Sequence, residues 1–471
     1  MSSHVLHKRR PRHIGIINDY VRIPYANGSS FASQFLYREF SKRGHDVTVL
    51  GPRDPMARED ELPRNAVLFD SVELKNHPGL FLAFPSRRAL ESASDLGLDV
   101  TLAQTGSGLL DLGLWLRQAR AVPLLCVNTI HLPSVYNVVL PDALYRSTQL
   151  SGVLEQYAVP QIERMQARAY NASDGLIVLS RGLERYWRER GVTVPIHVIP
   201  RAVNPIIVEK PDGPDPFAPG ATRGQRLLCV CRHTREKNLE RLIQIFAEVV
   251  VREAPKASLT LVGDGPDLDA FVAIATRYGV RDRVHFPGEF SVADVADFYR
   301  HADVFVYTSL SETYGQVVSE ALACGLPTVA FADEMGVSHQ LELSPAGSLI
   351  DPHGDPTRVN EDFGRAVLAL LRDPARRKLL GGLGARAARL ETAPELSVSR
   401  YYEAFESARQ NLLREPPVPG AGPSPSLVTL ARWTTLHAAL AAVGRVRKPA
   451  LLNRHGRTQP GWEELEARRV A

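Results

Sequence analysis

The chain has 471 residues, of which 44% are hydrophobic and 23% are charged, the composition of a folded protein large enough for two domains. Its formal net charge of only +4 excludes a chain built as a whole to bind polyanions, so we expect no nucleic-acid partner. No apolar run approaches the ~20 residues that span a bilayer.

The chain opens with a basic arm, residues 1–12, that contains no acidic residue. No apolar stretch follows the arm, so we do not expect a secretory signal. The four cysteines occur in apolar contexts, and we interpret them as reduced residues of a cytoplasmic protein. Two of them, Cys229 and Cys231, are expected to point to opposite faces of one strand.

Residues 13–205 are predicted to form a first domain in which short apolar runs alternate with helical stretches. Strands are predicted over 13–17, 47–50, 100–103, 124–127, 176–178 and 197–199, and a helix over 31–43. Such alternation indicates a parallel sheet that is covered by helices on both faces.

Residues 206–395 are predicted to form a second domain of the same kind, in which the strand–helix pattern restarts after a stretch rich in Pro and Gly at 209–225. Strands are predicted over 226–230, 258–262, 284–286, 304–307 and 328–331, and a helix over 239–252. The predicted fold class is therefore α/β, with two Rossmann-like doubly wound domains facing across a cleft. A helix at 396–413 could pack back on the first domain, and 414–471 would form a linker and a basic amphipathic tail.

The most informative segment is 309–327, where a strand ends, a loop contains Gly315, and a helix begins near Gln316. A helix N-terminus suits phosphate, because its backbone N–H groups are unpaired and its dipole end is positive. Glu320 lies about one turn into the helix and could accept hydrogen bonds from a ribose diol, as acidic residues of dinucleotide-binding sheets do. Glu312, in the loop, is better suited to sugar hydroxyls. Alone, the two glutamates could equally be a helix cap and a solvated residue.

Further candidates follow other predicted strands. Arg232 and Lys237 come directly after the strand at 226–230 and could stabilise a departing diphosphate, or could form a solvated basic loop. Gly28 would let backbone approach an anion, and His131 would project into the cleft unless it is structural. The Asp267-x-Asp269 pattern fits a helix start better than a metal site.

Together these segments resemble the retaining GT-B glycosyltransferases of family 4. The resemblance covers most of residues 13–410 and is densest from 226 to 350, where Glu312, Gly315, Glu320, Gly325 and Pro327 keep the family spacing. It implies that the first domain binds the acceptor and the second the nucleotide-sugar donor. It also implies that transfer retains anomeric configuration by front-side attack, without a metal or other cofactor.

The resemblance assigns roles residue by residue. Arg232 and Lys237 would hold the diphosphate, Glu320 the ribose, Glu312 the sugar hydroxyls, and His131 would lie beside the sugar. The remaining donor-binding candidates are positions at the phosphates, at the base or in the Glu312 loop: Gly28, Glu289, Phe290, Tyr314, Gly315, Gln316, Val317 and Val318. A UDP-sugar is the favoured donor and GDP-mannose the second candidate.

Two departures from the family pattern concern the pocket. The usual Asn-Gly of the crossover is here Arg201-Ala202, and the usual Gly-Gly after a later strand is Met335-Gly336. The Glu312-Thr-Tyr-Gly315 segment resembles members that act on lipid acceptors, which suggests a membrane lipid such as a diacylglycerol.

Two apolar segments leave alternatives open. Residues 131–142 could face an acceptor or membrane, or could be buried. In the tail, apolar residues at helical spacing accompany arginines, so residues 430–448 could lie on an anionic bilayer or could pack elsewhere. The protein would then be peripheral on the cytoplasmic face. One rival function is that of a catalytically silent GT-B protein that binds a nucleotide sugar or partner. The other is that of a dehydrogenase, but no clean G-x-G-x-x-G motif follows the first predicted strand.

Overall fold

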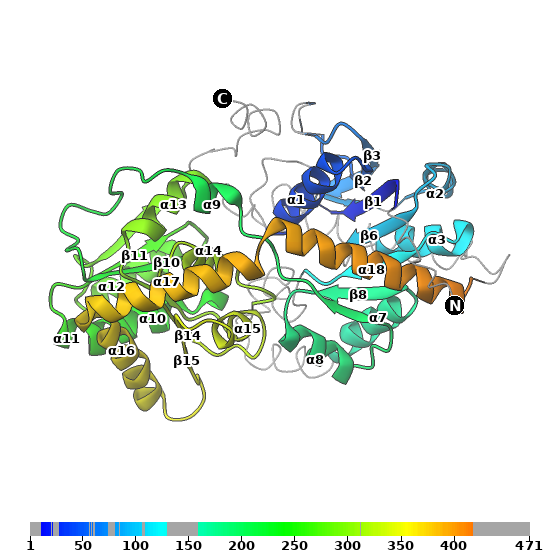
Figure 1. Cartoon of the computed structure of the whole chain (residues 1–471). Coiled ribbons are helices and arrows are strands. Elements are labelled where there is room, and N and C mark those ends of the chain that lie inside the picture. Colours follow the sequence, from blue (N-terminus) through cyan, green and yellow to red (C-terminus); the bar gives the residue numbers. More distant parts are fainter. Residues whose placement is uncertain are drawn as a thin grey trace, which may run out of the picture.

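A computed structural model describes residues 11–19, 21, 28–55, 57, 59, 62–73, 81–83, 85–105, 109–129, 159–310 and 312–417 (Figure 1). These residues form two α/β domains, each built on one parallel sheet. Most of the basic arm, His131, the apolar segment 131–142 and the tail beyond 417 lie outside the described residues.

The first domain is built on a parallel sheet with strand order β3-β2-β1-β6-β7-β8-β9. Its strands are β1 (His13–Asn18), β2 (Asp46–Pro52), β3 (Ala66–Phe69), β6 (Val100–Gln104), β7 (Leu124–Val127), β8 (Gly175–Val178) and β9 (Ile196–Val198), with a separate antiparallel pair, β4 (Ser71–Glu73) and β5 (Phe81–Ala83). The order of strands reverses between β1 and β6, which is the arrangement of a doubly wound sheet.

The second domain repeats this topology with the order β12-β11-β10-β13-β14-β15. Its strands are β10 (Arg226–Val230), β11 (Ser258–Val262), β12 (Val284–Gly288), β13 (Val304–Tyr307), β14 (Thr328–Phe331) and β15 (Gly347–Ile350). All pairs in this sheet are parallel, and the order reverses between β10 and β13. The predicted fold class of two doubly wound α/β domains is therefore confirmed.

Helices cover the sheets of both domains. In the first domain they are α1 (Gly28–Lys42), α2 (Arg87–Ser94), α3 (Leu110–Arg120), α7 (Val159–Asn171) and α8 (Arg181–Glu189). In the second they are α9 (Pro205–Glu209), α10 (Leu239–Ile245), α11 (Val251–Glu253), α12 (Leu268–Arg277), α13 (Val292–His301), α14 (Gln316–Ala323), α15 (Gly336–Glu342), α16 (Pro356–Arg372) and α17 (Pro374–Glu391). The helix predicted at 239–252 is interrupted by a wide π-type turn at Phe246–Val250.

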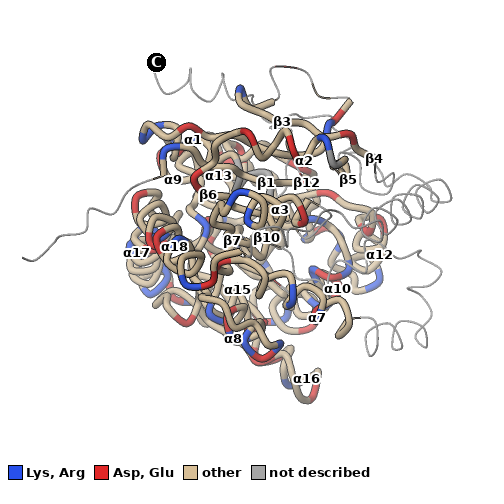
Figure 2. The backbone as a smooth tube through the Cα atoms, turned by 90° about the vertical axis from the view of Figure 1, so that its right-hand side faces the viewer, with Lys and Arg blue, Asp and Glu red and all other residues tan. Residues whose placement is uncertain are grey.

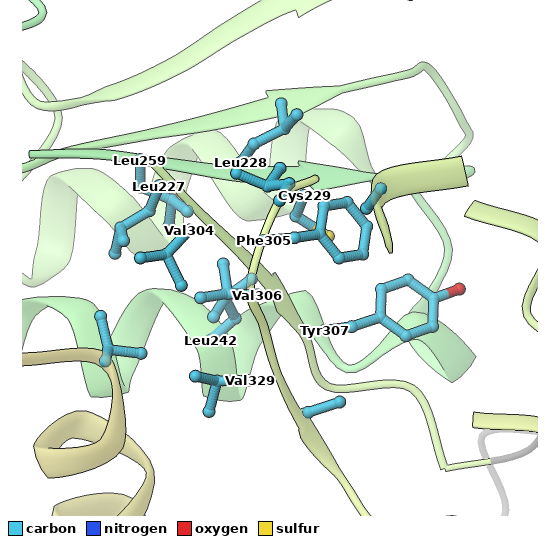
Figure 3. Close-up of a cluster of buried hydrophobic side chains, with 14 of the residues drawn as sticks. Leu227, Leu228, Cys229, Leu242, Leu259, Val304, Phe305, Val306, Tyr307 and Val329 are labelled. Atoms are coloured by element: carbon cyan, nitrogen blue, oxygen red, sulfur yellow. The ribbon is translucent and has the colours of Figure 1, made fainter. Parts of the chain in front are cut away.

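The core of the second domain lies where β10, β11 and β13 meet the helices. Figure 3 shows Leu228, Leu259 and Val306 among the interlocking apolar side chains of these strands, with Leu242 of α10 against them. Strands buried on both faces read as continuous apolar runs. Their burial fixes where each strand ends, and therefore where the residues that follow it project.

The last described helix, α18 (Pro394–Arg414), follows α17 of the second domain and lies over the first domain (Figure 1). There it packs on α1, where the ring of Phe405 lies 5.6 Å from that of Phe40. Tyr402 also exchanges a hydrogen bond of 2.7 Å with His45. The chain thus links its two domains at the 199–205 crossover and at the junction of α17 and α18.

Basic and acidic residues are mixed over the described helices. Figure 2 shows Lys and Arg interspersed with Asp and Glu over the helices of both domains. Within the described ranges, no helix combines the length and the apolar character needed to cross a bilayer.

Candidate functional site

The site begins where β10 ends, at one side of the point where the strand order reverses. After Val230 the chain runs through Arg232 and His233 into a short 3-10 turn that ends at Lys237. Asn238 follows with a left-handed φ of 56° and donates a hydrogen bond to the carbonyl of Thr308 at 3.3 Å. The hydroxyl of Thr308 in turn donates to the Asn238 carbonyl at 3.0 Å. The loops after β10 and β13 are therefore joined directly.

The two loops bring Lys237 and Glu312 into contact. Lys237 Nζ lies 2.5 Å from Glu312 Oε1, and the two side chains are 20% and 14% exposed. Tyr307 and Ser309 donate hydrogen bonds to the same oxygen at 2.8 and 2.7 Å. Among the described residues, Glu312 Oε2 has no hydrogen-bond partner. This second oxygen can therefore accept a bond from a hydroxyl.

The pair stays ionised at neutral pH. Burial by itself raises the pKa of Glu312, but the charge of Lys237 and the three hydrogen bonds bring that pKa below its ordinary value. Burial likewise lowers the pKa of Lys237, and the Glu312 carboxylate reverses this and raises it. A lysine ammonium has three donor hydrogens, so Lys237 can bind an anion while it keeps Glu312.

The Arg232 side chain is exposed and, within the described residues, makes no hydrogen bond or ion pair. His233 beside it is fully buried, and burial lowers its pKa to about 4. Its backbone N–H donates a hydrogen bond to the Asp264 carbonyl at 2.9 Å, and its carbonyl accepts one from the Asp267 N–H at 3.1 Å. The loop that carries Arg232 is thus fastened to the turn after β11.

The glycines of that turn permit this close approach. A Cβ atom on Gly263 would lie 1.9 Å from the Cys231 carbonyl oxygen, and one on Gly265 would lie 2.3 Å from the His233 carbonyl oxygen. Asp267 accepts a hydrogen bond from the Arg235 N–H at 3.0 Å and precedes α12. The described residues contain no group of three or more His, Cys, Asp or Glu arranged to hold a metal.

Helix α14 starts beside the Glu312 loop. Gly315 precedes it with a φ of 75°, a left-handed conformation that favours glycine. The unpaired backbone N–H groups of Gln316 and Val317 point out of the helix start, where an anion is stabilised. Val318 is fully buried, and its N–H already donates to the Gly315 carbonyl at 2.9 Å. The Gln316 side chain donates to the Ala202 carbonyl at 3.3 Å.

Glu320 lies one turn further along α14. Tyr299 of α13 donates a hydrogen bond to its Oε2 atom at 3.0 Å. Burial raises the pKa of Glu320 to about 7, only partly offset by hydrogen bonds from Tyr299 and Gln316. The side chain therefore changes charge near neutral pH.

The remaining predicted site residues are Tyr314, Glu289, Phe290 and Gly28, and also His131, which lies outside the described residues. The Tyr314 ring is only 2% exposed and packs in the core of the first domain, so its backbone rather than its ring would meet a donor, and the donor-binding role of Tyr314 stays a prediction. Glu289 and Phe290 follow β12, and the Phe290 ring packs 5.0 Å from Phe298. Gly28 is the first residue of α1.

Sequence reasoning missed several residues of the site. Tyr307 and Ser309 hold Glu312 from within five residues of it, and Tyr299 holds Glu320 from the preceding helix, but the sequence pattern did not single out these three hydroxyls. Arg201 is another: its Nε atom is buried without a hydrogen-bond partner in the described structure. Burial lowers the pKa of Arg201 to about 10, against the opposing influence of Tyr401, Tyr314 and Glu312. The sequence feature that could have pointed to Arg201 is that Arg201-Ala202 replaces the usual Asn-Gly of the family at the crossover.

Asp333 organises the far side of the Glu312 loop. Its carboxylate accepts hydrogen bonds from the N–H groups of Met335 and Ser338 at 2.9 Å each, and from that of Glu312 at 3.4 Å. It therefore ties the loop after β14 to the Glu312 loop. Across the domains, the Thr313 hydroxyl donates to the Thr129 carbonyl at 3.2 Å.

Two family models match the chain. Residues 27–206 match the model described as Glycosyltransferase Family 4, and residues 217–382 match the one described as Glycosyl transferases group 1. The two matches fall on the first and second sheets respectively.

Individual proteins are similar over different spans. An alpha-monoglucosyldiacylglycerol synthase of Streptococcus pneumoniae is 25% identical over 67% of this chain and 70% of that protein. A D-inositol 3-phosphate glycosyltransferase of Rhodococcus opacus is 32% identical, but the match spans 31% of this chain and 32% of that protein.

Solved structures share the fold. Anabaena HepE in complex with UDP superposes with a TM-score of 0.63 at 16% identity, over 84% of this chain and 100% of that one. A sucrose-phosphate synthase from Thermosynechococcus elongatus superposes with a TM-score of 0.59 at 21% identity, over 86% of this chain and 98% of that one. At these identities the likeness concerns the fold alone.

Proposed function

Because the chain belongs to the GT-B glycosyltransferases of family 4 and group 1, we propose that it transfers a hexose from a nucleotide-diphosphate sugar with retention of configuration. The observation that carries the proposal is the ion pair of Lys237 with Glu312 at the strand-order reversal of the second sheet. Ligands of open α/β sheets bind at the carboxyl ends of the strands at this position.

The donor would lie along the carboxyl ends of β10 and β13. Arg232 and Lys237 supply two cations, and the start of α14 supplies backbone N–H groups for the diphosphate. Glu320 would accept hydrogen bonds from the ribose. The second carboxylate oxygen of Glu312 would accept one from a sugar hydroxyl, while Lys237 keeps the first.

The proposed chemistry is a front-side substitution. The bond between the anomeric carbon and the leaving phosphate oxygen breaks, and the acceptor oxygen forms its bond on the same face. The acceptor proton passes to the leaving phosphate oxygen. Arg232, Lys237 and the α14 N-terminus would stabilise the negative charge that develops on the diphosphate. No metal or other cofactor is needed for this step, since fixed cations do the same electrostatic work.

This scheme differs from the two-carboxylate displacement of retaining glycosidases. There, one carboxylate attacks the sugar and forms a covalent intermediate. Glu312 is engaged by Lys237, Tyr307 and Ser309 through one oxygen, which suits it to hold and orient the sugar. His131 would lie beside the sugar from the first domain.

We propose a UDP-sugar as donor, with GDP-mannose as the second candidate, and a membrane lipid such as a diacylglycerol as acceptor. The solved complex of HepE with UDP supports the nucleotide, and the pneumococcal diacylglycerol relative supports the lipid. Such an acceptor would place the protein on the cytoplasmic face of a membrane, as a peripheral protein.

The test is turnover of defined donors. Purified protein is incubated with UDP-glucose, UDP-galactose or GDP-mannose, with and without diacylglycerol vesicles, and with or without a chelator. We expect one UDP-sugar to release UDP, faster with vesicles and equally with chelator, and to form an α-linked glycolipid. Binding of donors without any release of nucleotide would favour the catalytically silent alternative, and an inverted linkage would contradict retention.

A further inference from the structure

Cys229 and Cys231 form a close pair of thiols at the end of β10. Their Sγ atoms are 4.0 Å apart. The expectation that they point to opposite faces is wrong, because side chains two residues apart along a strand share one face. Cys229 is 1% exposed, whereas Cys231, just past the strand, is half-buried.

The backbone of Cys231 is held on both sides. Its N–H donates to the Val262 carbonyl at 3.0 Å. Its carbonyl oxygen lies against Gly263, where an added Cβ would come within 1.9 Å. A change in the position of Cys231 must therefore move the turn after β11 or the residue that follows, Arg232.

The thiol pair also borders the residues that hold Glu312. In Figure 3, Cys229 lies beside Phe305, and the hydroxyl of Tyr307 points away from the core. The rings of Phe305 and Tyr307 stack with centroids 5.9 Å apart, and the Tyr307 hydroxyl donates to Glu312 at 2.8 Å. Rearrangement at the thiols would therefore reach both Arg232 and Glu312.

We propose that Cys229 and Cys231 are an oxidation site, at which a peroxide forms a disulfide that weakens binding at the neighbouring donor site. The half-buried Cys231 thiol reacts first: its sulfur takes one oxygen from hydrogen peroxide, giving a sulfenic acid and water. The Cys229 sulfur then attacks the Cys231 sulfur, the S–S bond forms, and the sulfenic hydroxyl leaves with the Cys229 proton as a second water.

The order of these steps follows from burial. Its hydrogen-bonded contact with Cys231, together with burial, raises the pKa of the Cys229 thiol well above its ordinary value, so this thiol stays protonated until the second step. Burial raises the pKa of Cys126 and of Cys324 to about 12. Those two thiols are therefore expected to survive an exposure to peroxide that consumes the pair.

The expected effect follows from geometry. A disulfide needs its sulfurs at about 2.05 Å, so the two Sγ atoms must approach by about 2 Å. Because Cys231 is hydrogen-bonded to the turn after β11 and is followed directly by Arg232, this approach of the sulfurs is expected to displace Arg232. It is also expected to disturb the contact between Tyr307 and Glu312. The affinity for a nucleotide diphosphate should fall roughly tenfold, which corresponds to a small loss of charge-assisted contacts.

The experiment compares full-length protein, Cys231→Ser and the control Cys324→Ser before and after hydrogen peroxide. Peptide mapping by mass spectrometry locates any disulfide, and titration with UDP measures affinity. We expect a Cys229–Cys231 disulfide in the wild type and the control, weaker UDP binding, and recovery with dithiothreitol. Cys231→Ser should keep its UDP affinity after peroxide.

A second measurement does not depend on oxidation. Phenylarsine oxide, which bridges two neighbouring thiols, should bind the reduced wild type and Cys324→Ser but not Cys231→Ser. Two intact thiols after peroxide, or a disulfide that leaves UDP affinity unchanged, would overturn the proposal. The coupling to the donor site rests on the proposed function. If reduced protein binds no nucleotide, that function fails, and the mass spectrum alone decides the oxidation site.

Discussion

Lys237 Nζ lies 2.5 Å from Oε1 of Glu312, although the two residues are 75 positions apart in the chain. They meet because β10 and β13 are neighbours and their carboxyl ends open at the same edge of the sheet. The pair therefore depends on the doubly wound topology. It also links the cation loop to the loop that precedes α14.

The first prediction concerns the strength of this pair. Glu312→Gln removes one charge and leaves Lys237 half-buried without a counter-charge, so we expect the free energy of unfolding to fall by about 2 kcal/mol. Lys237→Met alone should cost a similar amount. A double-mutant cycle by urea unfolding should give a coupling energy of about 1–3 kcal/mol. Strictly additive losses would mean that the pair contributes nothing.

The second prediction concerns pH and stability at Glu320. Its pKa rises from 4.5 to about 7 on folding, so between these values the folded state binds more protons than the unfolded state. Stability must then fall as pH rises through this window, by up to about 3 kcal/mol. Glu320→Gln cannot ionise, so it should be more stable than the wild type at pH 8 and similar at pH 4. A constant difference at both pH values would contradict the assignment.

The third prediction concerns pH and binding at the same residue. The ribose contact needs the carboxylate form, so UDP affinity of the wild type should increase as pH rises through about 7. Glu320→Gln should bind UDP at least tenfold more weakly at pH 8, with little pH dependence left. Titrations from pH 6 to 8.5 check this. An unchanged profile in the variant would show that another group titrates.

The fourth prediction tests the turn that supports Arg232. Gly265→Ala places a Cβ 2.3 Å from the His233 carbonyl oxygen, a backbone atom that cannot easily move. We expect a loss of about 2–4 kcal/mol and weaker UDP binding. Gly220→Ala is the matched control, because nothing lies within 4 Å of its added Cβ. Equal unfolding midpoints for the two variants would sink this account of the turn.

Much of the fold could be predicted from the pattern of apolar runs. The predicted strands of both sheets were found because buried parallel strands are continuous apolar stretches. Four strands were missed: β3, a short outer strand, β15, whose Gly347 and Ser348 weaken the apolar signal, and the short antiparallel pair β4 and β5. The π-type turn at Phe246–Val250 was also unforeseen, since it leaves the amphipathic pattern almost intact.

The site was harder to predict, because its contacts join distant segments. Spacing suggested Lys237 and Glu312 but not their direct pairing, nor the donation from Tyr307. Tyr314 was predicted to bind the donor, and the pattern gave no sign that its ring packs among buried side chains of the first domain. Cys229 and Cys231 were predicted to point to opposite faces of the strand. Side chains alternate between the two faces, so residues two apart lie on the same face, as these two do.

The most direct test of the central claim is a titration of UDP into the wild type, Lys237→Ala and Lys210→Ala. Lys210 is the matched control, since it is also ion-paired, with Asp297 at 2.6 Å, and is 26% exposed. We predict that Lys237→Ala binds UDP more than tenfold more weakly than the wild type, while Lys210→Ala binds it equally well. Wild-type affinity in a folded Lys237→Ala protein would contradict the placement of the diphosphate at this edge of the sheet.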